Sequence, residues 1–174
     1  STALVELLSA SSNVSESRDP ETKQAIRRLL RVGGFKPSGR NKPASEYLVQ
    51  AIEKGRLGSI NPVVDVINVA SHRGGIPISV VDYERLIGLP RLVMGVAGQS
   101  YVFNASGQTI DVSGLLCLAD DEGPCANGVK DSQRTKPRAE TSRILTILWG
   151  TKELPGRTVQ VASQYRQLLD NFVA

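Results

Sequence analysis

The sequence has little of what a metal centre or a disulfide-stabilised fold requires. Its 174 residues include one histidine and two cysteines, and Cys117 and Cys125 lack the paired spacing of metal ligands. Two cysteines are too few for a disulfide framework, so we expect reduced thiols and a cytoplasmic location. The sequence also has no P-loop, dinucleotide-binding fingerprint or zinc-hydrolase motif. We therefore predict a protein with no cofactor and no metal ion.

Long hydrophobic runs are absent as well. No stretch of roughly 18 apolar residues exists, so nothing in the sequence predicts a membrane span. The first dozen residues have no leading basic cluster and do not resemble a signal peptide. A composition of 40% hydrophobic and 22% charged residues is typical of a globular protein of one domain. We expect residues 1–18 to form an arm or short helix and residues 19–174 to form that domain.

Capping signals predict helices in the first half of the chain and at its end. Asp19-Pro20 and Asn61-Pro62 each place a capping residue before a proline, and Gly33-Gly34 and Gly74-Gly75 end the two helices. Another helix is predicted between them, and a last one begins at Leu154-Pro155. The apolar faces that we expect for these two helices are Ala44, Tyr47, Leu48, Ala51 and Ile52, and Val159, Ala162, Tyr165, Leu168, Leu169 and Phe172.

Between residues 76 and 149 the pattern favours strands. Short segments rich in β-branched and other apolar residues are separated by turn pairs such as Ser106-Gly107 and Ser113-Gly114. The predicted strands are 76–81, 91–97, 100–103, 108–112, 115–118 and 144–149. Helices come first, strands follow and one helix closes the chain. This order predicts an α+β fold with N-terminal helices, central antiparallel or mixed sheets and a C-terminal helix.

Two basic clusters are candidates for nucleic-acid contact. One covers the first predicted helix and the loop after it, where Asp and Glu are nearly absent, and the other follows residue 129. Cations without local acidic partners release counterions when they bind phosphates. The candidate RNA-binding residues are Lys23, Arg27, Arg31, Lys36, Arg40, Lys130, Arg134 and Arg138. The alternatives are a solvated helix face for the first cluster and a mobile surface loop for the second.

Two other features favour structural roles. His72 lies in the last turn of a predicted helix, where a charged imidazole would interact favourably with the helix dipole. Asp120, Asp121 and Glu122 crowd a Gly-Pro turn, and we interpret them as solvated turn residues. No Ser–His–Asp or Cys–His set can be assembled from the sequence.

The order of several motifs resembles the editing (B3/B4) domain of the phenylalanyl-tRNA synthetase β subunit. The matching segments are Asn61–Asn68 (NPVVDVIN), Gly75–Asp82 (GIPISVVD) and the turn Ala126–Val129 (ANGV), with Thr141 and a strand after it. Roughly residues 43–149 take part, and free-standing relatives of this module look closer still. The resemblance implies a domain that binds tRNA, acts with the translation machinery and hydrolyses tyrosine wrongly attached to the phenylalanine tRNA.

The resemblance also implies pocket residues, and this chain departs from the family at three of them. The family's Asn falls on Asn68 and its turn glycine on Gly128, whereas its Thr becomes Ile67, its His becomes Ser79 and its tyrosine-reading Glu falls on or beside Ile147. A pocket without that carboxylate cannot satisfy a buried phenol, so we expect a substrate other than the tyrosyl ester or no editing at all. If hydrolysis occurs, we expect a positioned water, with backbone N–H groups near Gly128 as oxyanion donors.

Three functions therefore stay open. The first is an aminoacyl-tRNA deacylase acting in trans, with a pocket between the third helix and the glycine turn. The second is an RNA-binding module without chemistry, and the third is a pocket for a free amino acid or another small molecule. The cognate tRNA, the amino acid and the oligomeric state are not defined by the sequence.

Overall fold

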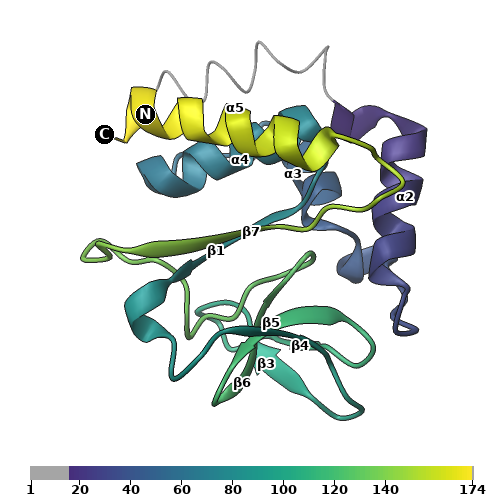
Figure 1. Ribbon diagram of the computed structural model, residues 1–174, viewed down its shortest axis with the longest axis vertical. Helices are drawn as coiled ribbons and strands as arrows, with labels where there is room; N and C mark the ends of the chain where they lie inside the picture. Colours follow the sequence, from purple (N-terminus) through teal and green to yellow (C-terminus); the bar gives the residue numbers. More distant parts are fainter. Residues whose placement is uncertain (1–15, 174) are drawn as a thin grey trace. The chain divides into compact units, whose positions relative to one another are not determined.

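The computed structural model describes residues 16–173, and the chain divides into two compact units (Figure 1). The first, the helical unit, contains Ser1–Ile26, Pro43–Ile78 and Leu148–Ala174. The second, the strand unit, contains Arg27–Lys42 and Ser79–Ile147. Of the arm expected at residues 1–18, residues 1–15 lie outside the described residues. The α+β class and its order of elements are confirmed.

The helical unit is built on two helices packed side by side, α4 (Pro62–Gly74) and α5 (Arg157–Phe172) (Figure 1). Gly74 lies so close to Val161 that a side chain at residue 74 would overlap the valine. The other helical elements are η1 (Glu16–Arg18), most of α2 (Pro20–Leu30) and α3 (Ala44–Glu53). In the part of the chain that the structure describes, no helix has both the length and the apolar character needed to cross a membrane.

The predicted caps at Asp19 and Asn61 and the predicted end of α4 are confirmed, whereas α2 ends at Leu30, before Gly33-Gly34, and α5 begins at Arg157, after Leu154-Pro155. The Asp19 carboxylate accepts a hydrogen bond from Thr22 N at 2.7 Å, and Asn61 caps α4 by accepting from Val64 N at 2.9 Å. Gly75 ends α4 in the left-handed region, with φ of 70°. The Ser17 hydroxyl lies 3.1 Å from Ser71 O and 2.8 Å from the backbone oxygen of the next residue, which ties η1 to the end of α4.

The predicted apolar faces of α3 and α5 are partly wrong. In α3 the buried residues are Ser45, Glu46 and Val49, whereas Ala44, Tyr47, Leu48, Ala51 and Ile52 are only half-buried. In α5 the buried residues are Val161, Tyr165 and Leu168, while Val159 is 75% exposed and Ala162 is exposed. Each observed face is shifted from the predicted one because tertiary contacts, rather than the count of apolar residues, decide which side of a helix is covered.

The strand unit contains most of seven strands in three small sheets. The strands are β1 (Ile78–Asp82), β2 (Arg91–Met94), β3 (Ser100–Val102), β4 (Thr109–Asp111), β5 (Leu116–Asp120), β6 (Gly123–Asn127) and β7 (Ile144–Leu148). They pair as β1-β7, β2-β5-β6 and β3-β4, and the last two sheets are antiparallel. A short 3-10 helix, η3 (Tyr83–Arg85), follows β1, and another, η2 (Gly39–Asn41), lies in the loop before α3.

Strand β6 was not predicted, because Gly123, Pro124 and the small residues after them are typical of a turn. It forms because β5 supplies an antiparallel partner, with Cys117 opposite Asn127 and an irregularity in register near Leu118. The strand unit has a buried core of its own. Its buried residues are Leu30, Phe35, Ile110, Val112, Leu115, Cys117 and Val129.

Candidate site at the glycine turn

The four predicted pocket residues are divided between the two units. Asn68 is half-buried on α4 of the helical unit, whereas Ser79 in β1, Gly128 after β6 and Ile147 in β7 belong to the strand unit. Within the strand unit the structure brings Ser79 to the segment around Gly128, and β1 pairs with the strand that carries Ile147. The pocket between Asn68 and Gly128 stays a prediction.

Residues 127–131, which we call the glycine turn, are ordered by the side chain of Asn127. Its Oδ1 accepts hydrogen bonds from Val129 N at 2.8 Å and from Lys130 N at 2.9 Å. Because backbone N–H groups can only donate, these bonds fix which end of the amide is oxygen. Asn127 is 2% exposed, so the arrangement is buried. The turn therefore consumes two of the N–H groups that the sequence suggested as oxyanion donors.

The other end of the Asn127 amide reaches the phenol of Tyr101 in β3. Asn127 Nδ2 donates to the Tyr101 oxygen, and the phenol donates in turn to Lys130 O at 2.5 Å. Tyr101 thereby closes a ring of hydrogen bonds across the turn. Burial, with the nearby Asp131 adding to it, raises the pKa of Tyr101 well above its ordinary value, so the phenol stays a neutral donor.

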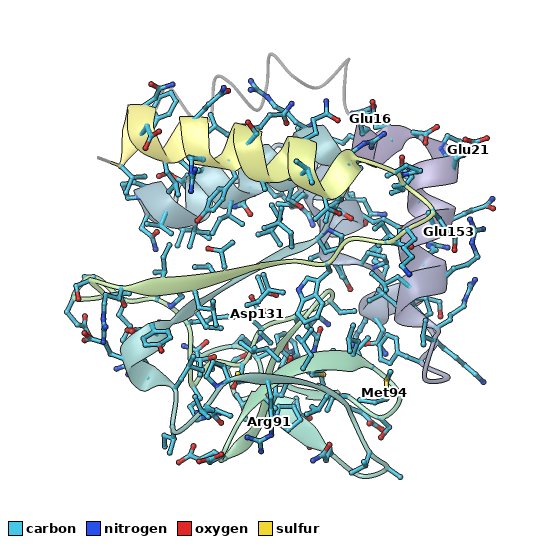
Figure 2. All side chains as sticks on the ribbon, viewed as in Figure 1. Glu16, Glu21, Arg91, Met94, Asp131 and Glu153 are labelled. Atoms are coloured by element: carbon cyan, nitrogen blue, oxygen red, sulfur yellow. The ribbon has the colours of Figure 1, made fainter. Side chains whose placement is uncertain are left out.

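Asp131 joins the glycine turn to β1. Its Oδ1 accepts the hydroxyl proton of Ser79 at 2.6 Å and the N–H of Asn127 at 3.2 Å. The Ser79 hydroxyl also lies 3.0 Å from Asn127 O. Figure 2 labels Asp131 beside the β1–β7 ribbon, and the residue is half-buried. Ser79, which stands where the family has histidine, is thus 1% exposed and held by the turn.

Burial dominates the electrostatics of this group. It raises the pKa of Asp131 to about 6, although the hydrogen bonds from Ser79 and Asn127 and the charge of Lys136 act in the opposite direction. Burial also raises the pKa of Cys117 to about 12 and that of Cys125 to about 11, so both thiols are neutral. The cysteines are free and buried, as expected of reduced thiols.

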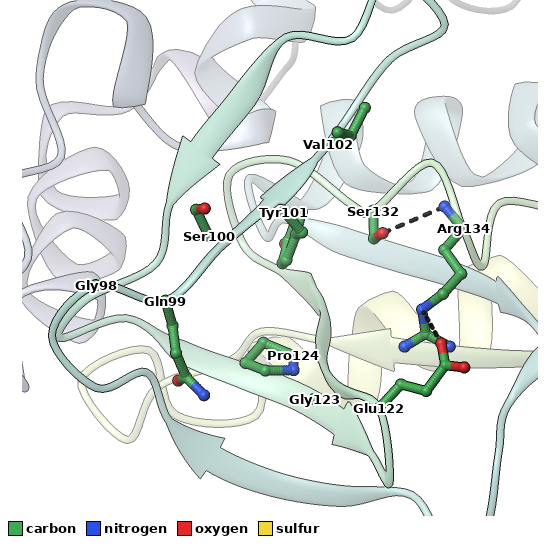
Figure 3. Close-up of a pocket in the computed structure, with 10 residues that line it drawn as sticks. All are labelled: Gly98, Gln99, Ser100, Tyr101, Val102, Glu122, Gly123, Pro124, Ser132 and Arg134. Carbon is green, nitrogen blue, oxygen red and sulfur yellow. Dashed lines mark hydrogen bonds and ion pairs between the residues drawn. The ribbon is translucent and has the colours of Figure 1, made fainter.

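A cavity of about 460 Å³ opens beside Tyr101 (Figure 3). Its walls are the edge of β3 with the turn before it and the hairpin between β5 and β6. The lining residues are Gly98, Gln99, Ser100, Tyr101, Val102, Glu122, Gly123, Pro124, Ser132 and Arg134. None of the four predicted pocket residues lines it. Tyr101 belongs both to this cavity and to the hydrogen-bond ring of the glycine turn.

Some of the candidate RNA-binding cations are exposed, and others bond to groups of the protein itself. Lys130 donates from Nζ to Arg40 O at 2.7 Å and lies 4.4 Å from the centre of the Phe103 ring. This bond joins the turn to the basic loop before α3. Burial, with Arg40 adding to it, lowers the pKa of Lys130. Among the candidates in the strand unit, Arg31, Lys36, Arg40 and Arg138 are exposed, and Arg27 is half-buried. Lys23 is half-buried in the helical unit.

Arg134 is a structural cation. Its two terminal nitrogens each lie 2.8 Å from a carboxylate oxygen of Asp120, and Nε lies 3.3 Å from Glu122. Asp120 is fully buried and also accepts from Ile87 N at 2.9 Å. Its interpretation as a solvated turn residue is therefore wrong. Burial alone would raise the pKa of Asp120, but the hydrogen bonds from Arg134 and the backbone outweigh it, and the pKa is lowered.

The segment after the glycine turn is anchored, contrary to the mobile-loop interpretation. Ser132 N donates to Cys125 O and Gln133 N to Val102 O, each at 2.8 Å. Further along, the Thr141 hydroxyl donates to the buried carboxylate of Asp82 at 2.6 Å. The basic residues between these anchors therefore stand on a fixed backbone.

The charged capping role expected for His72 is also wrong. His72 does lie in the last turn of α4, but its side chain is fully buried. Burial, with Arg18 and Arg73 adding to it, lowers its pKa, so the imidazole is neutral. Among residues 16–173, no group of three or more His, Cys, Asp or Glu side chains is arranged to hold a metal ion.

The Ser79–Asp131 pair could not be predicted from the sequence. These residues lie 52 positions apart, and neither belongs to a recognisable catalytic motif.

Comparison with known proteins agrees with this architecture. The B3/4 domain family matches residues 24–161, so the chain belongs to the B3/4 domain family. A phenylalanine–tRNA ligase beta subunit of Nitrosospira multiformis is 32% identical over 91 residues, which cover 47% of this chain. The matched part is 11% of the length of that ligase subunit. The resemblance inferred from the motifs is therefore confirmed.

Proposed function

We propose that this chain binds aminoacylated tRNA and hydrolyses the ester of a mischarged aminoacyl-tRNA in trans. Membership of the B3/4 family carries the proposal, because the related ligase subunit belongs to an enzyme that esterifies tRNA. The glycine turn supports it: a hydrogen-bonded backbone next to a partly buried carboxylate is suited to orienting a water and a carbonyl oxygen. An aminoacyl ester is already activated, so the chain needs no covalent nucleophile.

The exposed cations of the strand unit support the RNA part of the proposal. Arg31, Lys36 and Arg40 lie on one continuous stretch of the strand unit, and the Lys130–Arg40 bond connects this stretch to the glycine turn. Such cations bind phosphates without reading sequence and would hold the acceptor stem beside the turn. Arg134 takes no part, because Asp120 and Glu122 already neutralise it.

The test is a panel of labelled aminoacyl-tRNAs incubated with the full chain, with ester loss measured against buffer. We expect faster hydrolysis of one or a few mischarged esters, and a tyrosyl ester is not favoured because Ile147 offers no partner for a phenol. Equal stability of every ester with and without the protein would remove the enzymatic function.

A second assay tests the RNA part by itself. Changing Arg31, Lys36 and Arg40 to Glu should weaken tRNA binding and flatten the slope of log affinity against log salt by about two to three. Filter binding between roughly 50 and 200 mM salt measures this slope.

The control variant changes three exposed cations of the helical unit, Lys54, Arg56 and Arg166, to Glu, which alters the net charge equally. If both variants lose the same affinity, general charge rather than the proposed surface explains the binding.

Binding of RNA without chemistry is the second candidate. One observation favours it. The hydroxyl of Ser79, which stands where the family has histidine, already donates a hydrogen bond to Asp131 rather than pointing to a substrate. Under this function the panel shows no hydrolysis while the salt-dependent affinity persists. The cavity beside Tyr101 is where a free amino acid would bind under the third function, and thermal stabilisation by amino acids but not by tRNA would indicate it.

A further inference from the structure

We propose that Asp131 is a positioning residue, which holds the glycine turn against β1 so that the turn presents the Gly128 N–H as a donor to the reacting ester. The catalytic part of this inference rests on the proposed function. The positioning itself concerns only the strand unit and can be measured separately.

The first step is the use of the N–H groups in the turn. Asn127 N donates to Asp131 Oδ1, while Val129 N and Lys130 N donate to Asn127 Oδ1. Side chains of the turn itself therefore accept hydrogen bonds from three of the four N–H groups of residues 127–130. The turn leaves the Gly128 N–H unused by these bonds, and a single fixed donor is the kind of group that stabilises a developing oxyanion.

The second step is the connection to β1. Asp131 accepts from the Ser79 hydroxyl at 2.6 Å, and the Val80 N–H also hydrogen-bonds to this carboxylate. The carboxylate therefore joins two neighbouring residues of β1 to both ends of the turn. Without it, the turn would keep the Asn127 bonds but would lose its attachment to the strand.

The third step is the position of one proton. The Ser79 hydroxyl has a single proton and two acceptors in reach, Asp131 Oδ1 at 2.6 Å and Asn127 O at 3.0 Å. The charged carboxylate is the nearer and stronger acceptor, so the Ser79 hydroxyl donates its hydrogen bond to Asp131. If Asp131 is protonated, its own O–H can donate to Ser79, whose proton then turns to Asn127 O. Protonation thus replaces the charge-assisted bond and weakens the attachment of the turn.

Asp131 is the main group of this cluster that titrates between pH 5 and 8, because its titratable neighbours keep one protonation state over that range. Tyr101 from β3, Cys117 from β5 and Cys125 from β6 are all kept neutral by burial. Lys136 is the cation that acts on Asp131, and burial lowers its own pKa. The state of the turn should therefore follow the protonation of Asp131.

The test compares the full chain with Asp131→Asn, Ser79→Ala and the control Asp121→Asn, which removes an exposed carboxylate that pairs with Arg91. The first readout is amide hydrogen exchange of Asn127 and Val80, whose N–H groups bond to the Asp131 carboxylate. The second is kcat and KM for an ester that the panel shows to be cleaved, measured between pH 5 and 8.

We expect Asp131→Asn to speed exchange at both amides and to lower kcat by at least about tenfold with KM unchanged. Asp131→Asn should also abolish the rise of kcat with pH over the range in which Asp131 ionises. The control Asp121→Asn should leave the exchange rates, kcat and its pH profile unchanged. Ser79→Ala keeps the carboxylate and should give a smaller effect in the same direction, which also decides the matter if Asp131→Asn does not fold. Unchanged exchange in both variants, or an unchanged pH profile of kcat, would overturn the inference. If no ester is cleaved by the native chain, the proposed function and the catalytic role fail together, whereas exchange still decides whether Asp131 positions the turn.

Discussion

Removing the ionisable group at Asp131 should change how stability depends on pH. Burial raises its pKa to about 6 in the folded chain, whereas an unfolded aspartate titrates near 3.9. The folded chain therefore binds this proton more tightly. The stability that the bound proton supplies is complete below about pH 4 and is lost as pH rises through 6. Two pKa units correspond to about 3 kcal/mol of unfolding free energy.

The substitution Asp131→Asn isolates this contribution. Other groups act in the opposite direction. The pKa values of His72 and Asp120 are lowered in the folded chain, so both groups reduce the free energy of unfolding as the pH falls. The total stability curve therefore does not report on Asp131, but the difference between the variant and the native chain does. We expect that difference to move in favour of the variant by about 2–3 kcal/mol between pH 4 and pH 7.5. Any hydrogen bond lost with the asparagine adds a constant offset.

Urea unfolding at about six pH values, with the Asp121→Asn variant as a control for net charge, measures this difference. A difference that stays constant across the range would show that Asp131 titrates alike in the folded and unfolded chains. The account of its burial and of its bond with Ser79 would then be wrong.

Three further substitutions test the packing and hydrogen bonds. Gly74→Ala should cost about 1–3 kcal/mol because its methyl overlaps Val161, and Val161→Ala should relieve that cost in the double variant, as a double-mutant cycle of urea unfolding would show. Asp120→Ala leaves Arg134 without its buried partner and should cost about 3–5 kcal/mol, whereas a loss under 1 kcal/mol would mean that the ion pair is dispensable. Tyr101→Phe removes one acceptor and one donor from the ring of the glycine turn and should cost about 2–3 kcal/mol, with faster amide exchange at residues 129 and 130 as the second measurement.

The ends of α4 and the fold class could be predicted because their signals are local. Asn61, Pro62 and Gly75 determine the limits of α4 through a side-chain cap, a fixed φ and a left-handed residue, and each acts within one turn of the chain. Strand β6 could not be predicted, since its hydrogen bonds come from β5 rather than from its own sequence. The apolar face of α5 was misplaced for a related reason. Val159 has the right spacing but is 75% exposed among residues 16–173.

The candidate site was predictable only in part. Family motifs led to Ser79 and Gly128, and the structure brings their segments together. Asp131 was missed as a partner of Ser79 because a carboxylate in a polar, glycine-containing segment is typical of a solvated turn. Its burial depends on strands that lie far away in the sequence. Arg134 illustrates the converse error, since a cation in a basic run can be neutralised by acidic residues outside the run.

The pairing of Arg134 has a consequence for the direction in which RNA would approach. Arg143 is matched by Glu84 at 3.3 Å, and Lys136 donates to Phe103 O. Two of the arginines after the glycine turn, Arg134 and Arg143, are therefore paired with acidic side chains. The electric field that attracts a polyanion comes mainly from residues 27–42, so the first encounter would occur there and the strand would be drawn toward the turn only afterwards.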